Sequence, residues 1–128
     1  MDKYLINEEE KEILTFFIIK GIPEHYRMRL WILSSGALNQ IKLNSNYYSK
    51  LLELSKEVPS LYSDIIRKDI DRTNTQNPEL KKKLNNILIC YSIRNSSIGY
   101  CQGFNYIALM ILEIIKDEVI LFLFNAEY

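Results

Sequence analysis

Arg72 is a residue whose type and position suit phosphoryl-transfer chemistry. It stands three residues after Asp69, which itself stands three residues after Ile66, so a helix here would place all three on one face. Ile66 would be buried, and Asp69 would lie close enough to steady the Arg72 guanidinium. A guanidinium held in this way can neutralise the charge that builds on phosphoryl oxygens in a transition state. Taken alone, the triplet is explained more simply by a salt bridge that ends a helix.

Gln102 is a second candidate, in a segment bounded by Gly99 and Gly103. Glycine lets the backbone turn tightly and approach another surface closely, and a glutamine amide is both a donor and an acceptor. Gln102 could therefore hold an attacking water and a phosphate oxygen together. Tyr100 belongs to the same segment, and Asn105 stands where it could cap or brace the following helix. The simpler alternative is a turn between two helices with a satisfied polar side chain.

Arg27 and Trp31 form a third constellation, shortly after the sequence Gly21-Ile22-Pro23. Their spacing of four places them on the same face of a helix. Arginine can stack on tryptophan or bind a neighbouring carboxylate. A core tryptophan with a surface arginine is the alternative interpretation of this pair.

The elements that must position these residues are helices, because apolar residues recur at spacings of three and four along most of the chain. We find no alternating strand pattern of useful length and therefore expect an all-α, multi-helix bundle. The stretch Arg72 to Pro78 is rich in Thr, Asn and Gln and is expected to be a loop. The expected helices run from a capping box at Asn7 and Glu10 to Gly21, from Pro23 to Gly36, from a cap at Asn44 or Ser45 to Pro59, from Leu61 to Lys68, from Pro78 to Asn95 and from Gly103 onward, with Asp117 and Glu118 beginning a last one.

The composition is that of a folded domain and gives no sign of nucleic-acid binding. The 128 residues suffice for one domain, and the hydrophobic content of 48% and charged content of 25% are ordinary for a folded one. The formal net charge of +0 gives no basic footprint for nucleic acid. The short run Lys81-Lys82-Lys83 is interpreted as a solvated helix face rather than as a phosphate or lipid patch.

The cysteines and the apolar segments indicate an intracellular chain without a membrane span. Cys90 and Cys101 lack CxxC spacing, and the single histidine, His25, is distant in sequence, so no metal motif is formed. A catalytic cysteine–histidine pair is the alternative that sequence leaves open. Early acidic residues argue against a signal peptide. Charged residues interrupt the apolar stretch 104–124, which fits a pair of buried helices better than a membrane anchor.

Taken in order, the three constellations resemble the signature of the TBC family, whose members are all-helical activators of Rab-type GTPases. The resemblance rests on a GIP…RxxxW element, an IxxDxxRT element and a YxxxNPxxGYxQGxN element. It covers roughly Gly21 to Phe124, about the first half of a family domain. This chain departs from the pattern at Ser96, where the family usually has proline, at Phe104 in place of a common methionine, and at Asn74-Thr75, where an aromatic residue and a proline are frequent.

The resemblance implies a role for each candidate. Arg72 would be the arginine finger and Gln102 the glutamine finger, both supplied to a nucleotide on another protein. Asp69 would orient Arg72. By the same resemblance the remaining residues are supporting or structural: Tyr100, Gly99, Gly103 and Asn105 around the glutamine, and the pair Arg27 and Trp31.

The resemblance also implies the partner and the setting. The partner would be a Rab-type small GTPase that itself binds GTP and Mg²⁺, so the chain would need no cofactor and would stimulate the partner's hydrolase activity without a self-contained active site. It would act in the cytoplasm, peripherally at endomembranes of vesicle traffic. The alternative is a non-catalytic TBC-like scaffold that binds a GTPase or another protein.

The C-terminal residues suggest that the domain continues. Tyr128 comes soon after the apolar run Val119–Phe124. We therefore expect residues 1–128 to be the N-terminal, finger-bearing part of a domain whose C-terminal half is absent. We expect this apolar run to be exposed, and self-association would cover it.

Overall fold

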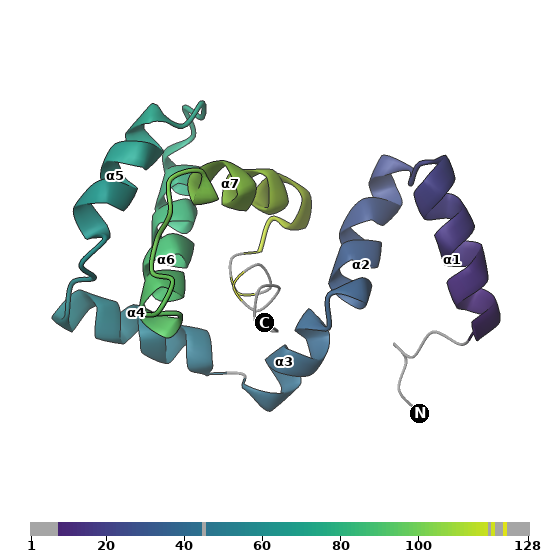
Figure 1. Ribbon diagram of the computed structural model, residues 1–128, viewed down its shortest axis with the longest axis horizontal. Coiled ribbons are helices and arrows are strands. Elements are labelled where there is room, and N and C mark those ends of the chain that lie inside the picture. The colour runs from purple at the N-terminus through teal and green to yellow at the C-terminus, as the bar shows by residue number, and fades with distance from the viewer. Residues whose placement is uncertain (1–7, 45, 118, 120–121, 123–128) are drawn as a thin grey trace.

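The computed structural model describes residues 8–44, 46–117, 119 and 122, and within them the secondary structure is helical with no strand. The expectation of an all-α fold is confirmed. Figure 1 shows the arrangement of the helices. They are α1 (Glu8–Lys20), α2 (Glu24–Ser34), α3 (Ala37–Leu43), α4 (Tyr47–Glu57), α5 (Ser63–Arg72), α6 (Pro78–Arg94) and α7 (Phe104–Ile115).

Helix α6 is the centre of the packing, with α4, α5 and α7 against it (Figure 1). The sequence predicts its start, because Pro78 lacks the N–H that a first helical position leaves unused. The side chain of Asn77 caps this end by accepting hydrogen bonds from the backbone N–H groups of Glu79 and Leu80, at 3.0 and 3.3 Å. Apolar residues spaced by three and four then face α5 and α7. The resulting core cluster consists of Ile66, Ile70, Leu84, Leu88, Ile89, Tyr100, Ala108 and Leu109.

The helix boundaries depart from expectation in three places. Helix α3 was not expected; Gly36, at φ +70°, ends the preceding turn, and its carbonyl accepts from Asn39 and Gln40 to start a new helix. The cap expected at Asn44 is wrong, because Asn44 ends α3 and α4 follows Asn46; Ser45 lies outside the described residues. Helix α5 runs four residues beyond Lys68, so the expected loop begins after Arg72. The expected cap at Asn7 and the start of a last helix at Glu118 fall outside the described residues.

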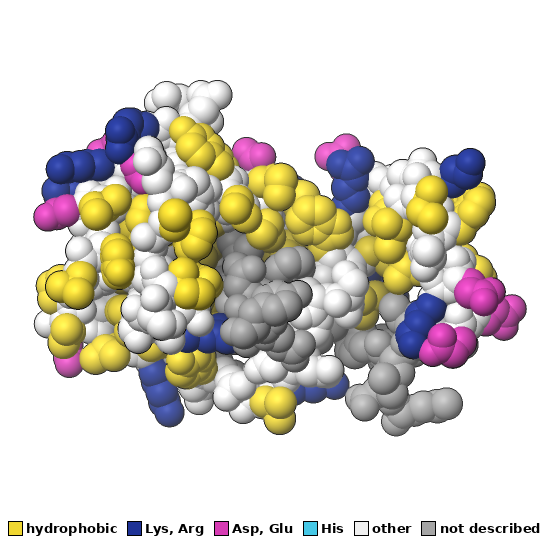
Figure 2. Space-filling model, viewed as in Figure 1, with side chains coloured by type: hydrophobic (Ala, Val, Ile, Leu, Met, Phe, Trp, Pro, Cys, Tyr) yellow, Lys and Arg dark blue, Asp and Glu magenta, His cyan; other side chains and the backbone are white. Residues whose placement is uncertain are grey.

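Helices α1 and α2 form an arm on the side of the molecule away from α4 and α5, and α2 of this arm contacts α7 (Figure 1). No residue of α1 is buried, and Figure 2 shows hydrophobic side chains at the surface of the arm. Its exposed apolar side chains include Ile13, Phe16 and Phe17, which the sequence predicts as one face of a helix. Among the described residues, no helix is both long and apolar enough to cross a membrane.

The apolar run near the C-terminus is not exposed where the structure describes it. Phe122 is 1% exposed and packs with Tyr48, Leu51 and Cys90, while Val119 is half-buried against the same cluster. The expectation of an exposed run is therefore wrong at Phe122, because α4 and α6 cover it. The other residues of the run lie outside the described ranges.

Candidate functional site

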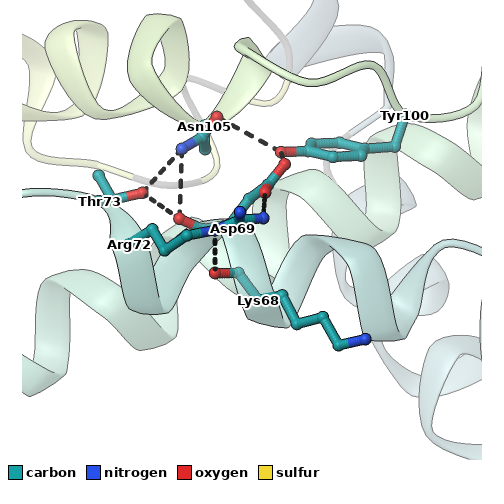
Figure 3. Close-up of polar contacts among 6 residues, drawn as sticks. All are labelled: Lys68, Asp69, Arg72, Thr73, Tyr100 and Asn105. Atoms are coloured by element: carbon teal, nitrogen blue, oxygen red, sulfur yellow. Dashed lines mark hydrogen bonds and ion pairs between the residues drawn. The ribbon is translucent and has the colours of Figure 1, made fainter.

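Arg72 occupies the last turn of α5, with the arrangement that its spacing predicts. Ile66 is fully buried, Asp69 is 4% exposed, and the Arg72 side chain is 66% exposed. One terminal nitrogen of the guanidinium donates to Asp69 Oδ1 at 2.5 Å, and Nε donates to the backbone carbonyl of Lys68 at 3.3 Å (Figure 3). Residues of α5 thus bind Nε and one terminal nitrogen of the guanidinium, and the exposed side chain remains accessible to a partner.

Gln102 lies in the segment between α6 and α7, which we call the glutamine loop (residues 99–103). Gly99 has φ +66° and Gly103, the N-cap residue of α7, has φ +104°, a region that favours glycine. Within the loop, Tyr100 is buried, whereas Cys101 and Gln102 are exposed. The loop therefore anchors itself through its tyrosine and leaves the glutamine at the surface.

A single carboxylate connects the arginine to the glutamine loop. Asp69 Oδ1 binds Arg72, and Asp69 Oδ2 accepts a hydrogen bond from the Tyr100 hydroxyl at 2.8 Å. Figure 3 shows Asp69 between these two side chains. Gln102 follows Tyr100 by two residues, so the loop that carries Gln102 is attached to the helix end that carries Arg72, 30 positions earlier in the sequence. Their common support is a buried acid with both oxygens satisfied.

Burial, followed by the hydrogen bond to Asp69, raises the pKa of Tyr100 well above its ordinary value. Both causes act in the same direction, because an apolar environment and a neighbouring carboxylate disfavour the phenolate. Tyr100 therefore stays protonated at physiological pH and remains a hydrogen-bond donor to Asp69.

The raised pKa of Tyr100 predicts a loss of stability in alkali. An unfolded tyrosine loses its proton near pH 10, whereas the folded chain retains it to higher pH, so above about pH 10 the unfolded state binds fewer protons. The free energy of unfolding should then fall as the pH rises further. Tyr100→Phe should remove this contribution and give a shallower decline in the thermal midpoint above pH 10.

The matched control for this titration is Tyr106→Phe, because Tyr106 is an exposed tyrosine on α7. It should leave the decline as steep as in the unmodified chain. Equal slopes in all three proteins would show that the proton on Tyr100 contributes nothing to folding.

Asn105 braces the site and does not cap α7. The N-cap position belongs to Gly103, without a side-chain capping bond, so the capping interpretation of Asn105 is wrong. The buried Asn105 amide instead donates to Thr73 Oγ1 at 2.8 Å and to the Asp69 carbonyl at 3.4 Å. Sequence reasoning gave Thr73 no role at the site, although it directly follows Arg72 and ends the IxxDxxRT element. The available signal was a small hydroxyl residue at a helix end, where backbone carbonyls need donors.

Arg27 and Trp31 lie on α2, apart from this network (Figure 1). Arg27 is exposed, and its Nε donates to the backbone carbonyl of Ile22 at 3.1 Å, which ties the helix to the turn before it. Trp31 is half-buried and packs beside the apolar side chains of α6 and α7. Trp31 thus joins α2 to the bundle, whereas the contact of Arg27 is local to the start of α2.

The other two kinds of site considered from the sequence are a catalytic cysteine–histidine pair and a metal site. Cys90 is buried in the apolar cluster with Phe122, and Cys101 is exposed in the glutamine loop. No group of three histidine, cysteine or acidic residues with the geometry to hold a metal ion is found among the residues that the structure describes.

Comparison with known proteins identifies the class. The sequence model of the Rab-GTPase-TBC domain family matches residues 24–126, and the chain belongs to this family. The crystal structure of the Chlamydomonas flagellar RabGAP TBC domain superposes with a TM-score of 0.81 at 28% identity, over 98% of this chain and 44% of that one.

Curated relatives agree with this assignment. Growth hormone-regulated TBC protein 1 of Xenopus laevis is 37% identical over 110 residues, and the protein of that name from Homo sapiens is also 37% identical over 110 residues. Each match covers 80% of this chain and 32% of the relative. The chain thus spans about a third of the length of these relatives.

Proposed function

We propose that this chain supplies an arginine finger and a glutamine finger to a Rab-type small GTPase and thereby accelerates GTP hydrolysis. The observation that carries the proposal is the Asp69 carboxylate, which binds both Arg72 and the tyrosine of the glutamine loop. Arg72 and Gln102 are both exposed, and Asp69 binds Arg72 as well as the loop that carries Gln102, which supports their action on one nucleotide. Membership of the TBC family supports the same function.

Each finger has a distinct chemical task in this proposal. Charge develops on the β- and γ-phosphate oxygens as the phosphoryl group is transferred, and the Arg72 guanidinium would neutralise it. The Gln102 amide would accept from the attacking water and donate to a phosphate oxygen, which aligns the water for in-line attack. The GTPase would hold GTP and Mg²⁺ itself, so this chain would act without a cofactor of its own.

The setting follows from the class of partner. Rab-type GTPases operate at the membranes of vesicle traffic, so we propose that the chain acts in the cytoplasm, peripherally at endomembranes.

Single-turnover hydrolysis of GTP by a panel of purified Rab-type GTPases tests the activity. The chain should raise the rate for at least one of them by on the order of 10³ or more, the range in which arginine fingers act. A rate that stays at the intrinsic value across the panel would contradict the proposal.

A non-catalytic scaffold is the second candidate, and the coverage of the relatives favours it, because the chain spans 32% of their length. The part of a relative that this chain matches can carry a docking surface without the complete catalytic geometry. Capture of a GTP-locked Rab on the immobilised chain separates the two functions. Binding without acceleration identifies a scaffold, and binding with acceleration identifies an activator.

A further inference from the structure

Helix α5 and the residues that flank it contact the glutamine loop and the start of α7. At the N-terminal end of α5, the ring of Tyr62 lies directly against Gly99, where an added Cβ atom would clash with the ring. At the C-terminal end, Thr73 receives the hydrogen bond from Asn105, the second residue of α7. Between them, Asp69 binds Tyr100. The loop and the start of α7 are therefore attached to α5 at both of its ends.

The hydroxyl of Thr73 is the C-terminal part of this attachment. It donates to the Asp69 carbonyl at 2.7 Å and accepts from Asn105 Nδ2 at 2.8 Å, as Figure 3 shows. Thr73 is 3% exposed and Asn105 is 2% exposed, so water has little access to replace either bond. Because Thr73 is bonded covalently to Arg72, a shift at Thr73 would displace the arginine and the start of α7 together.

We propose that Thr73 is a positioning residue, which acts through its hydroxyl to hold Arg72 and the glutamine loop in one fixed relative arrangement. This inference rests on the proposed function where it concerns the rate of hydrolysis. The coupling itself is a property of the chain alone. It predicts that loss of the hydroxyl loosens residues 100–105 and lowers the maximal stimulated rate more than it weakens binding of the GTPase.

Two variants of Thr73 isolate the hydroxyl. Thr73→Val keeps the shape and removes both hydrogen bonds, whereas Thr73→Ser keeps the hydroxyl and removes a methyl group. In Thr73→Val, amide hydrogen exchange over residues 100–105 should be roughly tenfold faster, because the buried Asn105 amide loses the shorter of its two hydrogen bonds and keeps only the one of 3.4 Å to the Asp69 carbonyl. The maximal single-turnover rate should fall by roughly the same factor, with the half-saturating concentration of the chain little changed. Thr73→Ser should show the same exchange over residues 100–105 and the same maximal single-turnover rate as the unmodified chain.

Thr75→Val is the matched control. Thr75 is a buried threonine two residues further on, and its hydroxyl accepts from the backbone N–H of Asn77, outside the network. This variant should leave exchange over residues 100–105 and the maximal rate unchanged. A general loss of stability would instead affect both valine variants, and it would accelerate exchange in α4 as well.

Hydrogen exchange and GTP hydrolysis test separate parts of the proposal. Unchanged exchange over residues 100–105 in Thr73→Val, or an equal increase in Thr75→Val, would overturn the positioning role. Faster exchange with an unchanged maximal rate would overturn it equally, since the loosened loop would then not matter for catalysis. If the unmodified chain accelerates no GTPase, the proposed function fails, and the exchange measurement still decides whether Thr73 couples the loop to α5.

Discussion

Replacing Arg72 by lysine is expected to slow the stimulated hydrolysis of GTP by about a thousandfold, while the chain stays folded. Lysine keeps the positive charge beside the buried Asp69 carboxylate, but it lacks the planar fork of donors that fits two phosphate oxygens at once. Arginine fingers contribute on the order of 10³–10⁵ to the rate. The change should therefore remove catalysis without leaving Asp69 unpaired. Single-turnover hydrolysis at saturating chain measures the effect.

Arg67→Lys is a control on the same helix. Arg67 pairs with Asp64 at the same spacing of three residues, at 3.0 Å, and its side chain is 69% exposed, close to the 66% of Arg72. The Asp64 carboxylate is exposed, however, and Arg67 contributes nothing to the network around the glutamine loop. Arg67→Lys should leave the rate unchanged. If Arg72→Lys slows the stimulated hydrolysis of GTP no more than Arg67→Lys does, Arg72 is a surface residue without a catalytic role.

Ile66→Ala is expected to lower the free energy of unfolding by about 3 kcal/mol, within the range of about 2–5 kcal/mol for isoleucine-to-alanine changes in cores. Ile66 is fully buried in the cluster that joins α5 to α6 and α7, so the smaller side chain leaves a cavity at this junction. Such a loss is a large fraction of the roughly 5–15 kcal/mol that stabilises a typical domain. Urea unfolding followed by circular dichroism measures it.

Ile65→Ala provides the comparison, because Ile65 is the neighbouring isoleucine on α5 and is 51% exposed. Its replacement should change the free energy of unfolding by less than about 0.5 kcal/mol. A similar loss in the two variants would mean that α5 does not pack on α6 as described. The site would then lack the platform that carries Arg72.

The site is accessible because α5 has one buried face and carries an exposed arginine at its C-terminal end. One face of the helix carries Ile66 and Ile70 into the core, and Asp69 lies on this buried side with both oxygens bonded. Arg72, at the helix end, reaches from that carboxylate to the surface. A buried acid is tolerated here because each oxygen has a donor, and the same two bonds orient the groups that would meet a partner.

Much of this protein could be predicted from local sequence. Periodic apolar residues predict the helical class, Pro78 predicts where α6 begins, and the spacing of Ile66, Asp69 and Arg72 predicts a buried residue, a paired acid and an exposed cation on one helix. These predictions hold because they depend on contacts within one or two helical turns, which spacing alone determines.

Tertiary packing decided the features that link distant segments. Asp69 meets Tyr100 across 31 positions, Thr73 meets Asn105 across 32, and Tyr62 fills the space beside Gly99. None of these contacts has a local signature, because each depends on how α5 lies against α6 and the start of α7. A carboxylate with two free oxygens, or a threonine at a helix end, has many possible partners in a sequence, and the packing of the three helices selects one.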